Sequence, residues 1–98
     1  MPKHIVKIRD RYFEWSTVVD APVTYGMTLD ELREHVREEY GNSGLEALPR
    51  RLERVERKGS SAHRGDLDSL LRVNRAGDRE SHATEAEIYR RFHTDPIL

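Results

Sequence analysis

Hydrophobic and polar residues alternate along residues 4–19, which is the pattern of β-strands with one buried face. With a two-residue connection at residues 10–11, Val6 falls opposite Trp15 on an apolar face, and an opposite-charge pair falls on the other face. Asp-Arg is a poor match to the Asn-Gly type of hairpin turn, so a connection longer by a residue or two stays open. We expect an antiparallel hairpin over residues 4–19.

Helix signals begin at Thr28. Glu31 stands three residues later, where a reciprocal capping box needs a carboxylate. Apolar residues then recur at helical spacing, and Gly41 supplies a left-handed stop. These signals predict a helix over residues 29–40.

A second helical stripe runs from Leu45 to Val55 and ends before Gly59. Pro49 interrupts this stripe, and a proline inside a helix costs about 3 kcal/mol. We therefore expect a helix over residues 45–58 that kinks or restarts at the proline. Because only a short link separates the two stripes, they predict an antiparallel helical hairpin.

The last third of the chain predicts two short helices. Gly, Ser and His at residues 59–65 predict a flexible linker. Leucines at helical spacing then predict a helix over about 67–76, although alternation at residues 71–73 would also suit a third strand. A second capping box, beginning at Thr84, predicts a final helix over residues 85–93.

Together these elements predict an α+β fold. An N-terminal antiparallel β-hairpin packs against a helical hairpin, and two short C-terminal helices follow. The 98 residues fit one small domain, residues 1–98, because single hydrophobic cores are commonly built from about 100–150 residues.

The composition gives this domain a thin core and a densely ionic surface. Charged residues make up 36% of the chain, against ~25% in ordinary domains. The formal net charge is only −1, so no overall field draws the chain to nucleic acid or to an anionic membrane. No run approaches the ~18 apolar residues of a membrane helix, and the first ten residues lack the apolar region of a secretory signal. We therefore expect a soluble protein of the cytoplasm.

No motif of a catalytic, metal or cofactor site appears in the sequence. Cysteine is absent, which excludes disulfides, thiolate catalysis and Cys-based zinc sites. No two of the five histidines have the i, i+4 spacing of a zinc site on a helix. Residues 74–85 have the length of a calcium loop, but Ala76 and Arg79 stand where an oxygen ligand and a glycine are required. Since no nucleophile elbow or Gly-rich phosphate loop appears either, we expect no enzyme.

The segment from Phe13 to Thr28 gathers aromatic and β-branched residues with only two charges. Its aromatic residues and Val19 are expected mainly in the core. A thin core leaves part of the segment for the surface, where apolar side chains serve as partner sites. The predicted partner-binding residues are Tyr12, Trp15, Val18, Val23 and Tyr25. Because Ile5, Tyr12 and Val18 share the outward face of the hairpin, either a third element or another chain covers them, and a homodimer is one possibility.

A basic run offers a second interpretation. Residues 45–65 carry six Lys and Arg against three Glu, a net charge of +3, whereas residues 27–44 net −3. Mutual attraction between the two predicted helices is the simplest account of these opposite charges. The alternative is nucleic-acid binding. The Glu residues interleaved with the basic residues would oppose it, because they repel phosphates. Its candidate residues are Arg50, Arg51, Arg54, Arg57 and Lys58.

Several segments carry a resemblance to a known family: KIRDRYFEWSTVVDAPVTYGMT, REEYG, LPRRLERVE, VNRAG and TEAEIYRRF. Together they cover most of the chain, and they resemble a family of small uncharacterised proteins encoded by phages of actinobacteria. The resemblance implies a phage accessory protein that acts inside a bacterial host. It implies no activity and no catalytic residue, because none is assigned to that family.

These observations favour a protein-protein interaction module that modulates a host or phage protein. A nucleic-acid-binding module that uses the basic helix, and a homodimeric structural protein without another ligand, are the alternatives.

Overall fold

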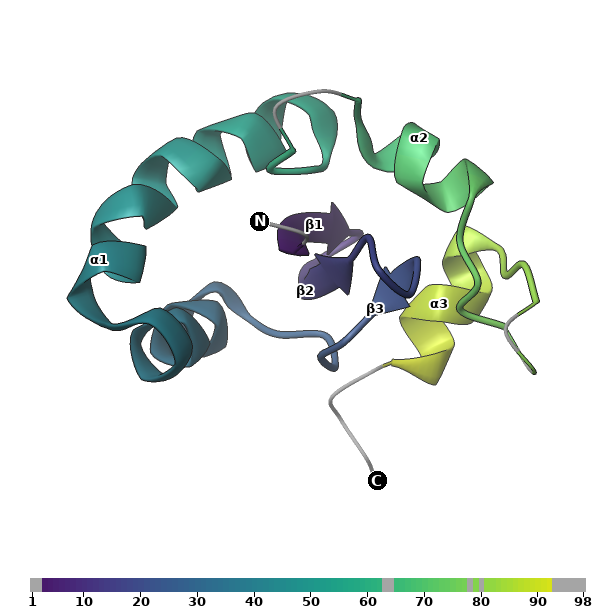
Figure 1. Cartoon of the computed structure of the whole chain (residues 1–98), viewed down its shortest axis with the longest axis horizontal. Helices are drawn as coiled ribbons and strands as arrows, with labels where there is room; N and C mark the ends of the chain where they lie inside the picture. Colours follow the sequence, from purple (N-terminus) through teal and green to yellow (C-terminus); the bar gives the residue numbers. More distant parts are fainter. Residues whose placement is uncertain (1–2, 63–64, 78, 80, 93–98) are drawn as a thin grey trace.

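In a computed structural model, the chain forms a three-stranded antiparallel sheet packed against one long helix, with two short helices (Figure 1). The structure describes residues 3–62, 65–77, 79 and 81–92. The strands, in sheet order, are β1 (Lys3–Ile8), β2 (Arg11–Ser16) and β3 (Ala21–Pro22). The helices are α1 (Leu29–Lys58), α2 (Leu67–Arg72) and α3 (Glu85–Arg91).

β1 and β2 form an antiparallel hairpin, in a register two residues away from the predicted one. Val6 pairs with Phe13 instead of Trp15, because the connection lies at residues 9–10. Arg9 has a φ of 57°, in the left-handed region that two-residue hairpin turns use. An even shift keeps every side chain on its predicted face, because successive residues of a strand alternate between the faces.

The second strand also ends earlier than predicted. β2 stops at Ser16, and a turn over residues 17–20 leads into β3, which pairs with the end of β2. Asp20 takes a left-handed φ of 55° in this turn. The third strand of the sheet is therefore residues 21–22, and residues 71–73 form no strand.

Helices cover both faces of the sheet (Figure 1). The buried side chains on the α1 side are Ile5, Tyr12, Met27, Leu32, Val36, Leu48 and Val55. Those on the side of α2 and α3 are Val6, Ile8, Phe13, Trp15, Ala76, Ala83 and Ile88. The hairpin face predicted to point outward is thus the one that α1 buries, while the short helices cover the Trp15 face.

In place of the predicted helical hairpin there is one long helix, α1, whose two halves meet at a kink at Gly41. The predicted capping box is confirmed: the Thr28 hydroxyl accepts from the Glu31 N–H at 3.2 Å, and the Glu31 carboxylate accepts from the Thr28 N–H at 2.8 Å. Gly41 has φ 67° and ψ −159°, a conformation essentially restricted to glycine. The chain resumes as helix directly afterwards, and Pro49 remains inside the helix. The predicted kink or restart at Pro49 is therefore wrong, since the only non-helical residue within α1 is Gly41.

Residues 59–62, the first part of the predicted flexible linker 59–65, pair with the outer edge of β1. The Ser61 N–H donates to the Ile5 carbonyl at 2.8 Å, and the Ser61 hydroxyl accepts from the Ile5 N–H at 2.8 Å. This pairing satisfies backbone groups that an open strand edge would leave unpaired. The prediction of a flexible segment is wrong here, and residues 63–64 lie outside the described part of the chain.

α2 and α3 are shorter than predicted. α2 ends at Arg72 and not near residue 76, because the Asn74 side chain closes the following loop. Its amide nitrogen donates to the carbonyls of Leu71 and Ala83, and its oxygen accepts from the N–H groups of Ala76 and Ala83. The capping box that begins α3 is confirmed, and α3 ends at Arg91. The predicted end of that helix, residue 93, lies outside the described residues.

Candidate functional site

A buried carboxylate lies between β2 and the first half of α1. The Glu14 side chain is only 4% exposed and faces α1. Its Oε1 lies 3.1 Å from His35 Nε2, and its Oε2 accepts a 2.6 Å hydrogen bond from the Tyr40 hydroxyl. A buried carboxylate without partners is costly, so these two contacts fix the positions of both α1 side chains.

The Tyr40 hydroxyl donates the shorter of the two contacts to Glu14. Burial, and then the hydrogen bond to Glu14, raise the pKa of Tyr40 to about 12, above the ordinary value of about 10. The hydroxyl is therefore protonated at neutral pH and acts as a donor to the carboxylate. Its ring forms a fixed wall at the end of the first half of α1.

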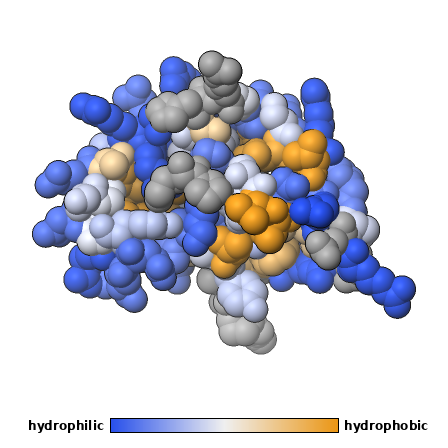
Figure 2. Space-filling view, viewed as in Figure 1, coloured by the Kyte–Doolittle hydropathy of each residue, from blue (hydrophilic) through white to orange (hydrophobic). Residues whose placement is uncertain are grey.

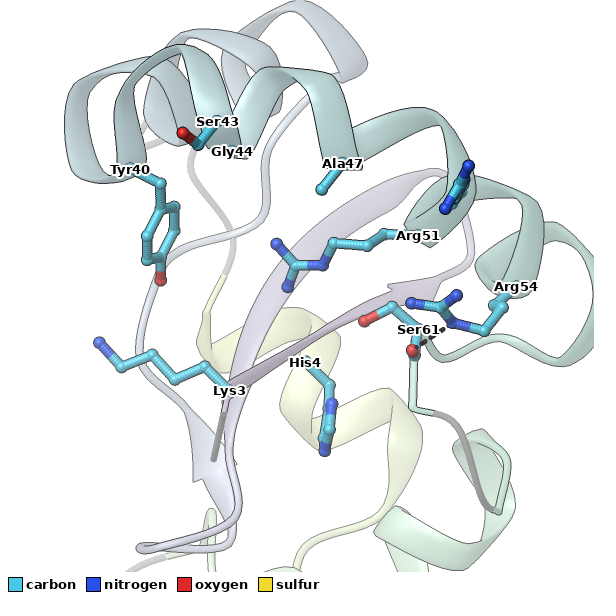
Figure 3. Close-up of a pocket in the computed structure, with 10 residues that line it drawn as sticks. Lys3, His4, Tyr40, Ser43, Gly44, Ala47, Arg51, Arg54 and Ser61 are labelled. Carbon is cyan, nitrogen blue, oxygen red and sulfur yellow. Dashed lines mark hydrogen bonds between the residues drawn. The ribbon is translucent and has the colours of Figure 1, made fainter.

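Beside this wall, a pocket of about 550 Å³ lies between α1, β1 and the segment paired with β1 (Figure 3). β1 contributes Lys3 and His4, and the second half of α1 contributes three arginines: Arg50, Arg51 and Arg54. No carboxylate lines this pocket within the part of the chain that the structure describes. We call it the basic pocket.

Arg54 is held by a hydrogen bond, and Arg51 is partly buried. Arg54 Nε donates a 2.7 Å hydrogen bond to the Ser61 carbonyl, as the dashed line in Figure 3 shows. Arg51 is half-buried, and this burial lowers its pKa, while the nearby Glu14 carboxylate and Tyr40 act in the opposite direction. Among the described residues, neither of these arginines forms an ion pair.

The predicted nucleic-acid residues divide into two groups. Arg50, Arg51 and Arg54 line the basic pocket, whereas Arg57 and Lys58 are not among its lining residues. Sequence reasoning missed Lys3 and the wall formed by Tyr40, because only the packing of β1 against α1 brings them beside the arginines.

The predicted partner-binding residues also divide. Trp15 is completely buried and Tyr12 is 8% exposed, so these two residues are part of the core. Val18, Val23 and Tyr25 are exposed, by 68%, 47% and 65%. The first two belong to the region where the chain leaves β2 and β3, and Tyr25 follows them before α1.

Val19 and Tyr25, both predicted mainly as core residues, lie on the surface. Val19 is 46% exposed because β2 ends at Ser16 and Val19 lies in the turn over residues 17–20, outside the sheet. Figure 2 shows hydrophobic side chains gathered on one face of the molecule, over the region of β3 and α2. We define the apolar patch as the exposed residues Val18, Val19, Val23 and Tyr25.

A contact with the loop after α2 supports the turn that carries this patch. The Arg75 N–H donates to the Asp20 carbonyl at 2.8 Å, and Arg75 Nε lies 3.5 Å from the Asp20 carboxylate. Val73, at the C-cap of α2, is a further exposed apolar residue, at 56%. The turn after β2, which carries part of the patch, is therefore held by the loop that follows α2.

The described residues contain no cluster of three or more His, Asp or Glu arranged to hold a metal ion. In the same part of the chain, no helix combines the length and the apolar character that crossing a membrane requires. The fold defines an α+β protein whose antiparallel sheet lies between a long kinked helix and two short ones. Comparisons with protein-family models, curated proteins and solved structures gave no significant match.

Proposed function

We propose that this chain is a protein-protein interaction module that binds its partner through the apolar patch. The observation that carries the proposal is the exposure of Val18 and Tyr25, at 68% and 65%, in a chain whose Trp15 is completely buried. Four large exposed apolar side chains fall within residues 18–25, and apolar side chains gathered on the surface are typical of sites that contact other proteins. The proposal assigns no catalytic residue.

Backbone hydrogen bonds hold the patch in place. The Val18 N–H donates to the Ser16 hydroxyl at 3.2 Å, and the Val23 N–H donates to the Glu14 carbonyl at 2.8 Å. Further along, the Gly26 N–H donates to the Phe92 carbonyl at 2.6 Å. A surface that is already ordered loses less conformational entropy on binding, which favours affinity.

The resemblance to proteins of actinobacterial phages gives the proposal its setting. In that setting the chain is a phage accessory protein that modulates a host or phage protein in the bacterial cytoplasm. Small phage proteins of this kind often act by binding a host protein, and this part of the proposal rests on analogy.

Affinity capture from an actinobacterial host lysate tests the proposal. The double variant Val18→Ser/Tyr25→Ser removes the most exposed apolar side chains of the patch. The control Arg33→Ser/Glu38→Ser changes two exposed positions of α1, where surface charges contribute little to stability. We expect one protein to be retained by the wild type and the control and lost by the patch variant. Equal retention by all three proteins, each shown to be folded, would contradict the proposal.

A second copy of the chain is the other candidate occupant of the patch. Light scattering over a concentration series distinguishes it: a dimer that the patch variant abolishes would favour the homodimeric alternative over a heterologous partner. A monomer at all concentrations leaves the patch free for another protein.

A further inference from the structure

Beyond the proposed interaction role, the geometry points to a second site: the basic pocket takes the phosphate group of a nucleotide-sized ligand. The pocket and the apolar patch share no residue. The two sites are therefore separable by mutation.

The positive charges of the pocket come from segments far apart in the sequence. Figure 3 shows the Lys3 side chain from β1 and the Arg51 side chain from α1 pointing into the space between these elements, beside Tyr40. Arg50 and Arg54 add two guanidinium groups from the same helix. A concave surface lined by one sign of charge concentrates ligands of the opposite sign.

The acidic half of α1 leaves these cations without ion pairs. Two of its carboxylates pair within the same half, Asp30 with Arg33 and Glu34 with Arg37. The predicted attraction between the two helices would have joined these carboxylates to the basic half instead. Among the described residues no ion pair crosses Gly41, and the Glu14 carboxylate near Arg51 is already bonded to Tyr40 and in contact with His35. The arginines of the pocket therefore remain available to a ligand.

Arginine suits a phosphate because its planar fork donates several hydrogen bonds in fixed directions. Arg54 is held by the Ser61 carbonyl, and the Ser61 hydroxyl and N–H are in turn bonded to Ile5 of β1. Arg51 is half-buried, where water screens its charge less than at an exposed site. The donors are therefore partly positioned before any ligand enters.

The size and the walls of the pocket point to an organic phosphate. Its volume of about 550 Å³ falls within the range of about 300–1,000 Å³ of small-molecule sites and exceeds what inorganic phosphate would fill. The Tyr40 ring, Gly44 and Ala47 form a less polar part of the lining, which precedes the arginines along α1 and against which a base or sugar would pack. Gly44 allows this part of the lining, since a Cβ there would meet the Tyr40 Cβ at 2.5 Å.

Calorimetric titration with pyrophosphate, AMP, ATP and a short single-stranded DNA, with and without a 5′-phosphate, tests the inference. The pocket variants are Arg51→Gln and Lys3→Gln, and the control is Arg57→Gln, which makes the same charge change on α1 outside the lining. We expect one-to-one binding that each pocket variant weakens by at least about tenfold and the control by less than about twofold. Lys3 is exposed, so its variant keeps the test valid if Arg51→Gln loosens the fold.

The probes also distinguish the source of the phosphate. Tighter binding of ATP or AMP indicates a free nucleotide, and tighter binding of the 5′-phosphorylated strand indicates a nucleic-acid end. Three results would overturn the inference. These are equal weakening by all three variants, equal binding of both strands without nucleotide binding, and no binding of any probe at millimolar concentration.

Discussion

The Tyr40 hydroxyl donates a 2.6 Å hydrogen bond to the Glu14 carboxylate and so joins the first half of α1 to the middle of β2. Glu14 is the residue of β2 that also contacts His35, so one buried carboxylate positions two side chains of the helix. Tyr40 lines the basic pocket as well. The stability of the fold and the shape of the pocket therefore depend on the same hydrogen bond.

Removing this hydroxyl should destabilise the protein. In Tyr40→Phe the Glu14 carboxylate keeps its burial and loses a donor, which costs about 1.5–3 kcal/mol in free energy of unfolding. The control is Tyr25→Phe, which removes a hydroxyl from a 65% exposed ring and should change stability little. Urea unfolding followed by fluorescence of the buried Trp15 measures both variants, and equal stability of the two would contradict the role of the bond.

Alkaline pH should weaken the fold through the same residue. The pKa of Tyr40 is raised to about 12 in the folded protein, mainly by burial and then by Glu14, against about 10 in the unfolded chain. A raised pKa means that the folded state favours the protonated hydroxyl. The stabilisation is therefore complete below about pH 10 and is lost as the pH rises towards about 12. The free energy of unfolding of the wild type should fall as the pH rises across this window. The part of the fall that comes from ionisation of Tyr40 should be absent in Tyr40→Phe.

The kink of α1 should require glycine at position 41. Its φ of 67° and ψ of −159° are strained for any residue with a Cβ, so Gly41→Ala should cost about 1–3 kcal/mol. Apart from the adjoining residues and the nearby backbone of α1, no atom lies within 4 Å of the added methyl group, so backbone strain and not a clash would be responsible. Ser43→Ala, at an exposed helical position two residues further on, is the control. Chemical denaturation compares them, and a neutral Gly41→Ala would show that the kink conformation is not required.

The side chain of Asn74 should be essential for the loop after α2. Asn74→Ala would leave the buried N–H and carbonyl of Ala83 without their partners, at a cost of at least about 2 kcal/mol. Asn42→Ala removes an amide from an exposed position of α1 and serves as the control. Thermal unfolding should separate the two variants clearly. If both variants unfold at the same temperature as the wild type, water replaces the lost hydrogen bonds and the role assigned to Asn74 is wrong.

Local signals predicted the starts of α1, α2 and α3 correctly, whereas the start predicted at residue 45 lies inside α1. Thr28 with Glu31, and Thr84 with Glu87, form capping boxes because each depends on residues three positions apart. The alternation along the hairpin likewise determined which side chains share a face, although the turn lies one residue earlier than predicted.

Features that depend on contacts distant in sequence could not be predicted. Polar residues 59–62 have a linker composition, and only the unpaired edge of β1 makes them extend the sheet. The same packing of α1 on β1 brings Lys3 beside Arg51 in one pocket. No periodicity or spacing in the chain signals either contact.

The prediction of which residues are buried was wrong for the residues that follow the end of β2. Val19 continues the alternating pattern of β2, but the turn after Ser16 removes it from the sheet. Tyr12 lies on the hairpin face for which the sequence of the hairpin indicates no covering element. In the structure α1 covers this face. Hydrophobic patterning describes the faces of a strand and does not say where the strand ends.

Site-directed photo-cross-linking in the host cell tests the proposed interaction surface most directly. A photoreactive residue at Val23 lies in the apolar patch, and the same residue at Glu38 lies on the exposed side of α1. The proposal predicts a single cross-linked protein from position 23 and none from position 38. The same cross-linked protein from both positions, or none from position 23, would contradict it.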